Sequence, residues 1–143
     1  MRDKQIREIR AFNRFYTDII GLLNQNILDS TWSLAEARVI YEIFKGKSIT
    51  ATQIIEIMHV DKSYLSRLIK KLEKEKIITK KQSGQDGRIL QLSLTQKGTK
   101  TFESLNRASD EQIATLLQPL TEGQCEELSF HMQAIQNILK NDK

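Results

Sequence analysis

The sequence contains little cysteine, proline or glycine, and each shortage excludes a class of protein. Its 143 residues include one cysteine, one proline and six glycines. Because Cys125 is alone, no intramolecular disulfide can form, which suits a reducing compartment. The single proline and the few glycines leave little room for a disordered or loop-rich chain.

Long apolar runs are also missing. No run approaches the roughly 20 apolar residues that cross a bilayer. The first residues, MRDKQIREIRAF, lack the apolar core of a signal peptide. We therefore expect a cytoplasmic protein without a membrane partner. Hydrophobic residues make up 39% and charged residues 28% of the chain, which is ordinary for a globular domain with one sizeable core.

Positive charge is concentrated in one segment. Between residues 62 and 88 the chain carries nine Lys or Arg against three acidic residues. This excess of six exceeds the net charge of +4 for the whole chain, so the remainder is slightly acidic. Such a concentration indicates a polyanionic partner.

The first part of the chain has apolar side chains at helical spacing. Residues 4–27 predict a helix whose apolar face is too wide for a solitary surface helix: Ile9, Phe12, Tyr16, Ile19, Leu23 and Ile27. Ser33 and Glu36 have the spacing of a capping box and predict a second helix from Leu34 to about Lys45, ended by Gly46. Its inward residues are expected to be Leu34, Ala37, Val39, Ile40, Ile43 and Phe44.

Two shorter helices follow, and the second is basic. Thr50 is the predicted N-cap of a helix over 51–58, and Asp61 caps one over about 62–76. The second helix has an apolar face made by Leu65, Leu68, Ile69 and Leu72. Two helices joined by a tight turn, the second basic on its outer face, indicate a helix-turn-helix.

The helical period is then lost over residues 77–82 and 89–94. In the second run leucines alternate with polar residues, and the connection 83–88 contains Gly84 and Gly87. This pattern predicts a half-buried hairpin, to which residues 47–49 could add a strand. A helix-turn-helix followed by such a hairpin is a winged helix.

Two further helices are predicted after the hairpin. Thr95 caps the first, which runs until Pro119, and Thr121 opens the second with capping-box spacing. The last helix has a narrow stripe typical of a helix–helix seam: Cys125, Leu128, Met132, Ile135 and Leu139.

Several short motifs resemble the MarR family of bacterial regulators in order and spacing across nearly the whole chain. They are Asp61-Lys62-Ser63, Ser66-Arg67-Leu68, Lys71-Leu72-Glu73, Asp86-Gly87-Arg88, Leu94-Thr95-Gln96-Lys97-Gly98 and Leu120-Thr121-Glu122. A finer resemblance relates residues 9–17, 20–23 and 33–39 to the regulatory half of proteins that fuse a MarR-type domain to a GNAT acetyltransferase. The chain stops where such an acetyltransferase would begin, and no acetyl-CoA-binding loop occurs in it.

The resemblance implies a mainly α fold with a small β-hairpin wing (α+β), in a single MarR-type domain over 1–143. Residues 33–95 are expected to form the winged helix-turn-helix lobe that binds DNA. Helices within 1–30 and 97–143 are expected to intertwine in a homodimer. Such a dimer reads a pseudo-palindromic operator on double-stranded DNA, and repression is the default outcome when the operator overlaps a promoter.

The expected DNA-binding residues lie on the basic helix and the wing. Ser63, Tyr64 and Arg67 are candidates for reading base edges in the major groove. Arg67 has two open roles, a guanine contact or a structural contact to phosphate or Asp86. Phosphate contacts are expected from Lys62, Ser66, Lys70, Lys71 and Lys74, although lysines alone also fit a solvated helix face. By resemblance, Arg88 enters the minor groove while Asp86 and Gly87 support the wing.

An effector cleft is a further expectation from the resemblance, for a small aromatic or anionic ligand. Its candidate lining residues are Phe12, Phe15, Tyr16, Trp32 and Tyr41, with Arg14 or Arg38 as anion partner. Aromatic residues at helical spacing also fit an ordinary core, so both interpretations stay open.

Other function classes have less support. The sequence contains no Ser/His/Asp set, phosphate-binding glycine loop or metal cluster, so no enzyme activity and no cofactor are expected. His59 and His131 do not form a metal-ligand pair, and Cys125 on an apolar stripe fits a buried thiol better than a redox sensor. A dimeric interaction module without DNA binding is the remaining alternative, against which the basic helix and the wing together argue.

Overall fold

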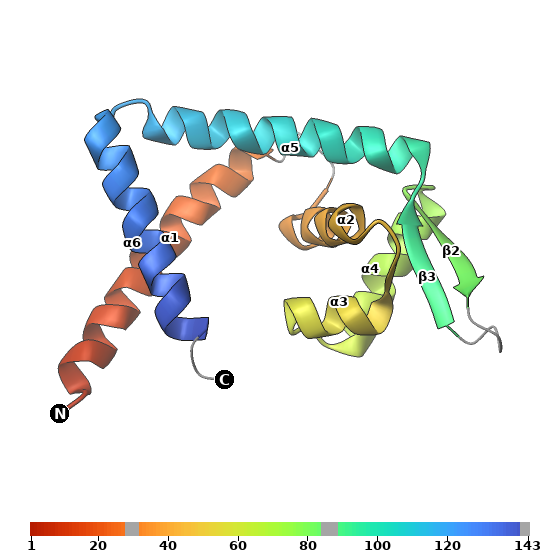
Figure 1. The fold of residues 1–143 in the computed structure, drawn as a ribbon, viewed down its shortest axis with the longest axis horizontal. Coiled ribbons are helices and arrows are strands. Elements are labelled where there is room, and N and C mark those ends of the chain that lie inside the picture. Colours follow the sequence, from red (N-terminus) through yellow and green to blue (C-terminus); the bar gives the residue numbers. More distant parts are fainter. Residues whose placement is uncertain (28–31, 84–88, 141–143) are drawn as a thin grey trace. The chain divides into compact units, whose positions relative to one another are not determined.

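The computed structural model describes residues 1–27, 32–83 and 89–140, with side chains described over 1–21, 32–82 and 89–140. It divides into two compact units, Met1–Ala108 and Ser109–Lys143, and each is described by itself. The elements in chain order are α1 (Asp3–Ile27), α2 (Leu34–Gly46), β1 (Ile49–Thr50), α3 (Ala51–Met58), α4 (Lys62–Lys74), β2 (Ile78–Ser83), β3 (Ile89–Leu94), α5 (Gln96–Leu117) and α6 (Glu122–Lys140). Figure 1 labels all of them except the short strand β1. The predicted fold class, mainly α with a small wing, is confirmed. Over these ranges no helix is long and apolar enough to span a membrane.

The three strands form one antiparallel sheet in the order β1-β3-β2. In the β2–β3 hairpin Ile78 pairs with Leu94, and Ser83 pairs with Ile89. This hairpin is the predicted wing. The short strand expected at 47–49 lies at Ile49–Thr50, where Ile49 pairs with Leu92 of β3. The sheet thereby joins the start of α3 to the base of the wing.

Side-chain caps fix where the helices begin, as the sequence predicts. Ser33 and Glu36 form the expected capping box at α2, and Thr50 forms one with Gln53 at α3. The Asp61 carboxylate accepts hydrogen bonds from two backbone amides at the start of α4. Two helix ends differ from expectation. Helix α2 includes Gly46, with Lys47 taking the positive φ, and α4 ends at Lys74 because the chain turns through Lys76, also at positive φ.

The core lies between α2, α3, α4 and the sheet. Its fully buried members include Val39, Ile40, Ile43, Ile54, Leu65, Leu72, Ile77, Ile78 and Leu92. All four residues predicted for the buried face of α4 belong to this core. Burying such side chains stabilises the fold by about 2 kcal/mol each.

The burial of two leucines and one phenylalanine differs from expectation. Leu34 and Phe44, predicted to face inward, are exposed, and Phe44 instead stacks on Phe102 of α5 with ring centroids 3.9 Å apart. Leu90 of the alternating strand is also exposed, whereas Leu92 is buried. The helical and strand periods are therefore correct, but only the part of each apolar face that a neighbouring element covers is buried.

The junction between the wing and α5 joins three elements through backbone atoms. The Thr95 amide donates to the Ile77 carbonyl at 2.9 Å, and the Thr95 hydroxyl donates to the Lys76 carbonyl at 2.6 Å. The same hydroxyl oxygen accepts from the Gly98 amide at 2.9 Å. At Gly98 a Cβ atom would lie 2.1 Å from the Ile77 carbonyl oxygen, so only glycine fits there. This explains in physical terms the spacing of Thr95 and Gly98.

We predict that Gly98→Ala destabilises the protein by roughly 2–3 kcal/mol, because backbone must move to admit the methyl group. Gly123→Ala is the matched control, since its nearest neighbouring atom would be 4.0 Å from the added carbon. Urea unfolding of both variants checks this. Equal stability of Gly98→Ala and the wild type would contradict the steric account.

Candidate nucleic-acid interface

The turn between α3 and α4 sets the direction of the basic helix. His59 ends α3 in the left-handed conformation, with φ 54° and ψ 43°, and its amide donates to the Ile55 carbonyl at 2.8 Å. Asp61 then starts α4 within two residues. The two helices are thereby joined by the tight turn that a helix-turn-helix requires.

Helix α4 presents a line of side chains opposite its buried face. Because Leu65, Leu68, Ile69 and Leu72 point into the core, Ser63, Arg67, Lys70 and Lys74 lie on the far side of the helix, and all four are exposed. We call these four residues the outer line. The Arg67 guanidinium carbon lies 5.8 Å from the centre of the Tyr64 ring, which is a cation–π distance between side chains one helical turn apart.

The flanks of α4 face neighbouring elements. On one flank Glu73 forms an ion pair with Lys80 of β2 at 3.4 Å, which joins the helix to the wing. Lys62 and Ser66 lie on the same side by helical position and are exposed. Lys62 and Ser66 therefore stay on the accessible surface, next to the outer line.

On the other flank Lys71 contacts α2. Its Nζ lies 2.7 Å from Oε2 of Glu36, and 5.5 Å from the centre of the Trp32 ring. Burial raises the pKa of the Glu36 carboxyl, but hydrogen bonds from Lys71 and Ser33 outweigh it and hold this pKa below its usual 4.5. The same hydrogen bond raises the pKa of Lys71 above its usual 10.5. Lys71, predicted to contact phosphate, thus forms an ion pair within the protein, although 45% of its side chain stays exposed.

The wing supplies further positive charge. Lys81 of β2 is paired with Gln91 of β3, and Ser48 donates to the Gln91 side-chain oxygen at 2.9 Å. Both Lys80 and Lys81 are exposed. The predicted wing residues Asp86, Gly87 and Arg88 lie outside the described residues, so their roles stay predictions.

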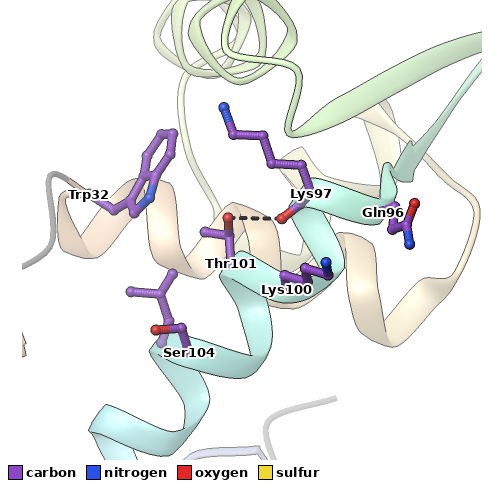
Figure 2. A pocket seen from close by; sticks show the side chains of 7 residues that line it. Trp32, Gln96, Lys97, Lys100, Thr101 and Ser104 are labelled. Atoms are coloured by element: carbon purple, nitrogen blue, oxygen red, sulfur yellow. Dashed lines mark hydrogen bonds between the residues drawn. The ribbon is translucent and has the colours of Figure 1, made fainter.

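A cleft opens beside Trp32 at the start of α5, with a volume of about 570 Å³. The cleft is lined by Trp32 and by six residues of α5: Gln96, Lys97, Lys100, Thr101, Ser104 and Leu105. Figure 2 shows the Trp32 side chain across from the start of α5. The Lys97 ammonium donates to the Glu75 carbonyl at 3.0 Å, so this lysine joins α5 to the end of α4. The cleft therefore combines one aromatic wall with two positive charges.

Of the effector residues predicted from sequence, Trp32 is the one that lines this cleft. Phe12 and Tyr16 stack on each other on α1, with ring centroids 5.6 Å apart, and Phe15 is exposed. On α2, Arg38 pairs with Glu42 at 2.7 Å, and Tyr41 lies against Phe102. The family resemblance suggested these residues. The signal that sequence reasoning missed was the pair Lys97 and Lys100, which share one helical face.

No group of three or more potential metal ligands occurs among the residues for which side chains are described. Cys125 is partly buried on α6. The Nε2 atom of His131 lies 3.6 Å from Oε1 of Glu127, one turn earlier on the same helix. This spacing is that of an ordinary side-chain pair within a helix.

Comparisons with known proteins agree with this architecture. Residues 32–90 match the model of the MarR family. A Bacillus subtilis protein named as the HTH-type transcriptional regulator YybA is 26% identical over 139 residues, covering 96% of this chain and 89% of its own length.

Two solved structures of Escherichia coli MarR share the fold. A mutant form superposes with a TM-score of 0.79 at 19% identity, covering 89% of this chain and 94% of that chain. A complex of a MarR mutant with operator DNA has a TM-score of 0.76 at 18% identity, covering 94% of this chain and 97% of that chain. Residues 32–90 are therefore similar to the MarR family, and the chain shares the winged-helix fold of these solved structures.

Proposed function

We propose that this protein is a transcriptional regulator that binds double-stranded DNA through α4 and the wing, as a homodimer. The observation that carries the proposal is the outer line of α4, which is polar and basic on the side that the core leaves open. An α-helix fits the major groove of B-DNA. The MarR mutant solved with operator DNA shares this fold, which supports the same use of it here.

The outer line divides into two halves, one proposed to contact base edges and the other proposed to contact phosphates. Ser63 and Arg67, near the N-terminal end of α4, are placed to meet base edges, since helix-turn-helix proteins approach bases with that end. A bidentate Arg67–guanine contact contributes about 1–3 kcal/mol of discrimination. Lys70 and Lys74, further along the line, provide phosphate contacts together with Lys62. Arg88 is proposed to enter the adjacent minor groove.

Dimerisation is proposed to bury apolar surface on α1 and α6. On α1 the exposed apolar residues include Ile6, Ile9, Phe12 and Phe15. On α6 two apolar lines run on opposite sides, the predicted stripe that includes Ile135 and a second line of Phe130, Ala134 and Ile138. Phe130 and Ile138 are each 70% exposed. A helix that is apolar on two sides needs packing partners on both.

A two-fold dimer reads two half-sites about one helical turn, roughly 34 Å, apart. Repression follows when such an operator overlaps a promoter, because the bound dimer blocks polymerase. This activity would take place in the cytoplasm. Whether the natural gene continues into an acetyltransferase, as the finer resemblance suggests, is read directly from coding sequence beyond Lys143.

Ligand response is proposed to act through the cleft between Trp32 and α5. An aromatic anion would place its ring against Trp32 and its charge near Lys100. Lys97 joins this cleft to the end of α4 through the Glu75 carbonyl. A ligand that draws Lys97 away would therefore change the support of the DNA-binding helix.

We expect the dimer to bind a duplex of about 30 bp, selected from a random pool, with log K falling against log salt at a slope of roughly −5, for about six phosphates. Lys74→Gln should reduce the slope by about 2, since one contact is lost in each subunit. Lys4→Gln on α1 is the control and should not change it. Fluorescence anisotropy at several salt concentrations measures this, and a flat salt response of the wild type would refute the proposal.

We expect Ile138→Glu to weaken dimerisation tenfold or more, because the interface would bury an unpaired carboxylate twice. Gln133→Glu, which lies between the two apolar lines, is the control and should leave the dimer intact. Sedimentation equilibrium distinguishes a monomer of 16.6 kDa from a dimer of twice that mass. A wild-type monomer at micromolar concentration would rule out the dimer.

We expect benzoate at about 10 mM to stabilise the protein by about 1.4 kcal/mol, if its dissociation constant is about 1 mM. Benzyl alcohol, which has the ring without the charge, should have less effect. Lys100→Gln should abolish the stabilisation by benzoate. Thermal unfolding measures all three, and equal effects of benzoate on the wild type and Lys100→Gln would exclude Lys100 as the anion contact.

A further inference from the structure

We propose that the Glu36–Lys71 ion pair fixes how α4 is presented to DNA, so that Lys71 is a positioning residue and makes no phosphate contact. This inference rests on the proposed function, because it assigns a role within DNA binding. It changes the assignment of one lysine in a helix whose other lysines are proposed to bind DNA directly.

The Glu36 carboxylate is buried, and each of its two oxygens contacts a partner within the protein. Only 4% of the residue is exposed. Its Oε1 accepts a hydrogen bond from the Ser33 amide at 2.8 Å, which caps the start of α2. Its Oε2 lies 2.7 Å from the Lys71 ammonium. One carboxylate therefore joins the first turn of α2 to the last turns of α4.

Trp32 lies beside the same contact. The residue is only 9% exposed, and the centre of its ring lies 5.5 Å from the Lys71 ammonium, whose side chain stays 45% exposed. The lysine is thus placed between an anion and an aromatic face, and both interactions favour its charged form. If Lys71 contacted a phosphate instead, it would lose its contacts with Glu36 and Trp32. The buried Glu36 carboxylate would then have no counter-ion.

The position of Lys71 on the helix agrees with this assignment. At 100° per residue, it lies about 70° around α4 from the outer line, toward α2. Lys70, the preceding residue, lies on the outer line itself. These adjacent lysines are therefore a matched pair for comparison. Lys71 is expected to contact α2, and Lys70 is expected to contact DNA.

The two roles predict opposite effects of Glu36→Gln on DNA affinity. Glutamine keeps an oxygen for the Ser33 amide but cannot hold the Lys71 charge. If the pair positions α4, affinity for the selected duplex falls by roughly three- to tenfold. If Lys71 contacts phosphate, affinity rises, because the variant frees the lysine and removes a negative charge from the DNA-binding lobe.

The salt dependence separates Lys71 from Lys70. Lys71→Gln is expected to weaken binding while leaving the slope of log K against log salt at the wild-type value. Lys70→Gln is expected to reduce the slope by about 2 per dimer, as a phosphate contact does. Lys71→Arg, which keeps the charge and the reach to Glu36, should restore affinity to within about twofold of the wild type.

The double variant Glu36→Gln/Lys71→Gln controls for misfolding, because it leaves no uncompensated buried charge. It is expected to melt above Lys71→Gln and to bind DNA no more weakly than that single variant. Tighter binding by Glu36→Gln, or a slope reduced by Lys71→Gln as much as by Lys70→Gln, overturns the positioning role. A wild-type protein that binds no selected duplex instead overturns the proposed function, and this inference with it.

Discussion

The buried face of α4 is the constraint on which the rest of the interface depends. Leu65, Leu68, Ile69 and Leu72 can all enter the core at only one rotation of the helix about its axis. That rotation determines which side chains face outward, so apolar packing places Ser63, Arg67, Lys70 and Lys74 where duplex DNA can meet them. No base-reading residue needs to contribute to stability, and no core residue needs to touch DNA.

Polar contacts then fix the position of this helix along its two flanks and at its end. Glu73 and Lys80 connect it to the wing, while Glu36 and Lys71 connect it to α2. Beyond its C-terminus, Thr95 and Gly98 bring the start of α5 against the backbone of Lys76 and Ile77. Lys97 adds a hydrogen bond to the Glu75 carbonyl from the wall of the cleft. The helix that is proposed to read DNA is therefore supported by the elements that line the proposed effector site.

Much of the local structure could be predicted, because the signals are short in range. Ser33 with Glu36, Thr50 and Asp61 each cap a helix within three residues, so their roles depend only on neighbouring backbone. The buried stripe of α4 follows from the helical period alone. The burial of apolar residues near the ends of elements does not follow from the period in the same way. Leu34, Phe44 and Leu90 continue the apolar pattern, but whether a neighbour covers them depends on packing that periodicity does not contain.

The sequence by itself determined the order of elements, their caps, the core face of α4 and the concentration of positive charge around it. Only the tertiary structure decided that Lys71 meets Glu36, and that Lys97 and Lys100 share a cleft with Trp32. The physical reason is distance along the chain. Caps and apolar periods act within a few residues, whereas Glu36 and Lys71 are joined by the packing of two helices that a strand, another helix and a turn separate. Chain order places no constraint on that contact until the shared core has formed.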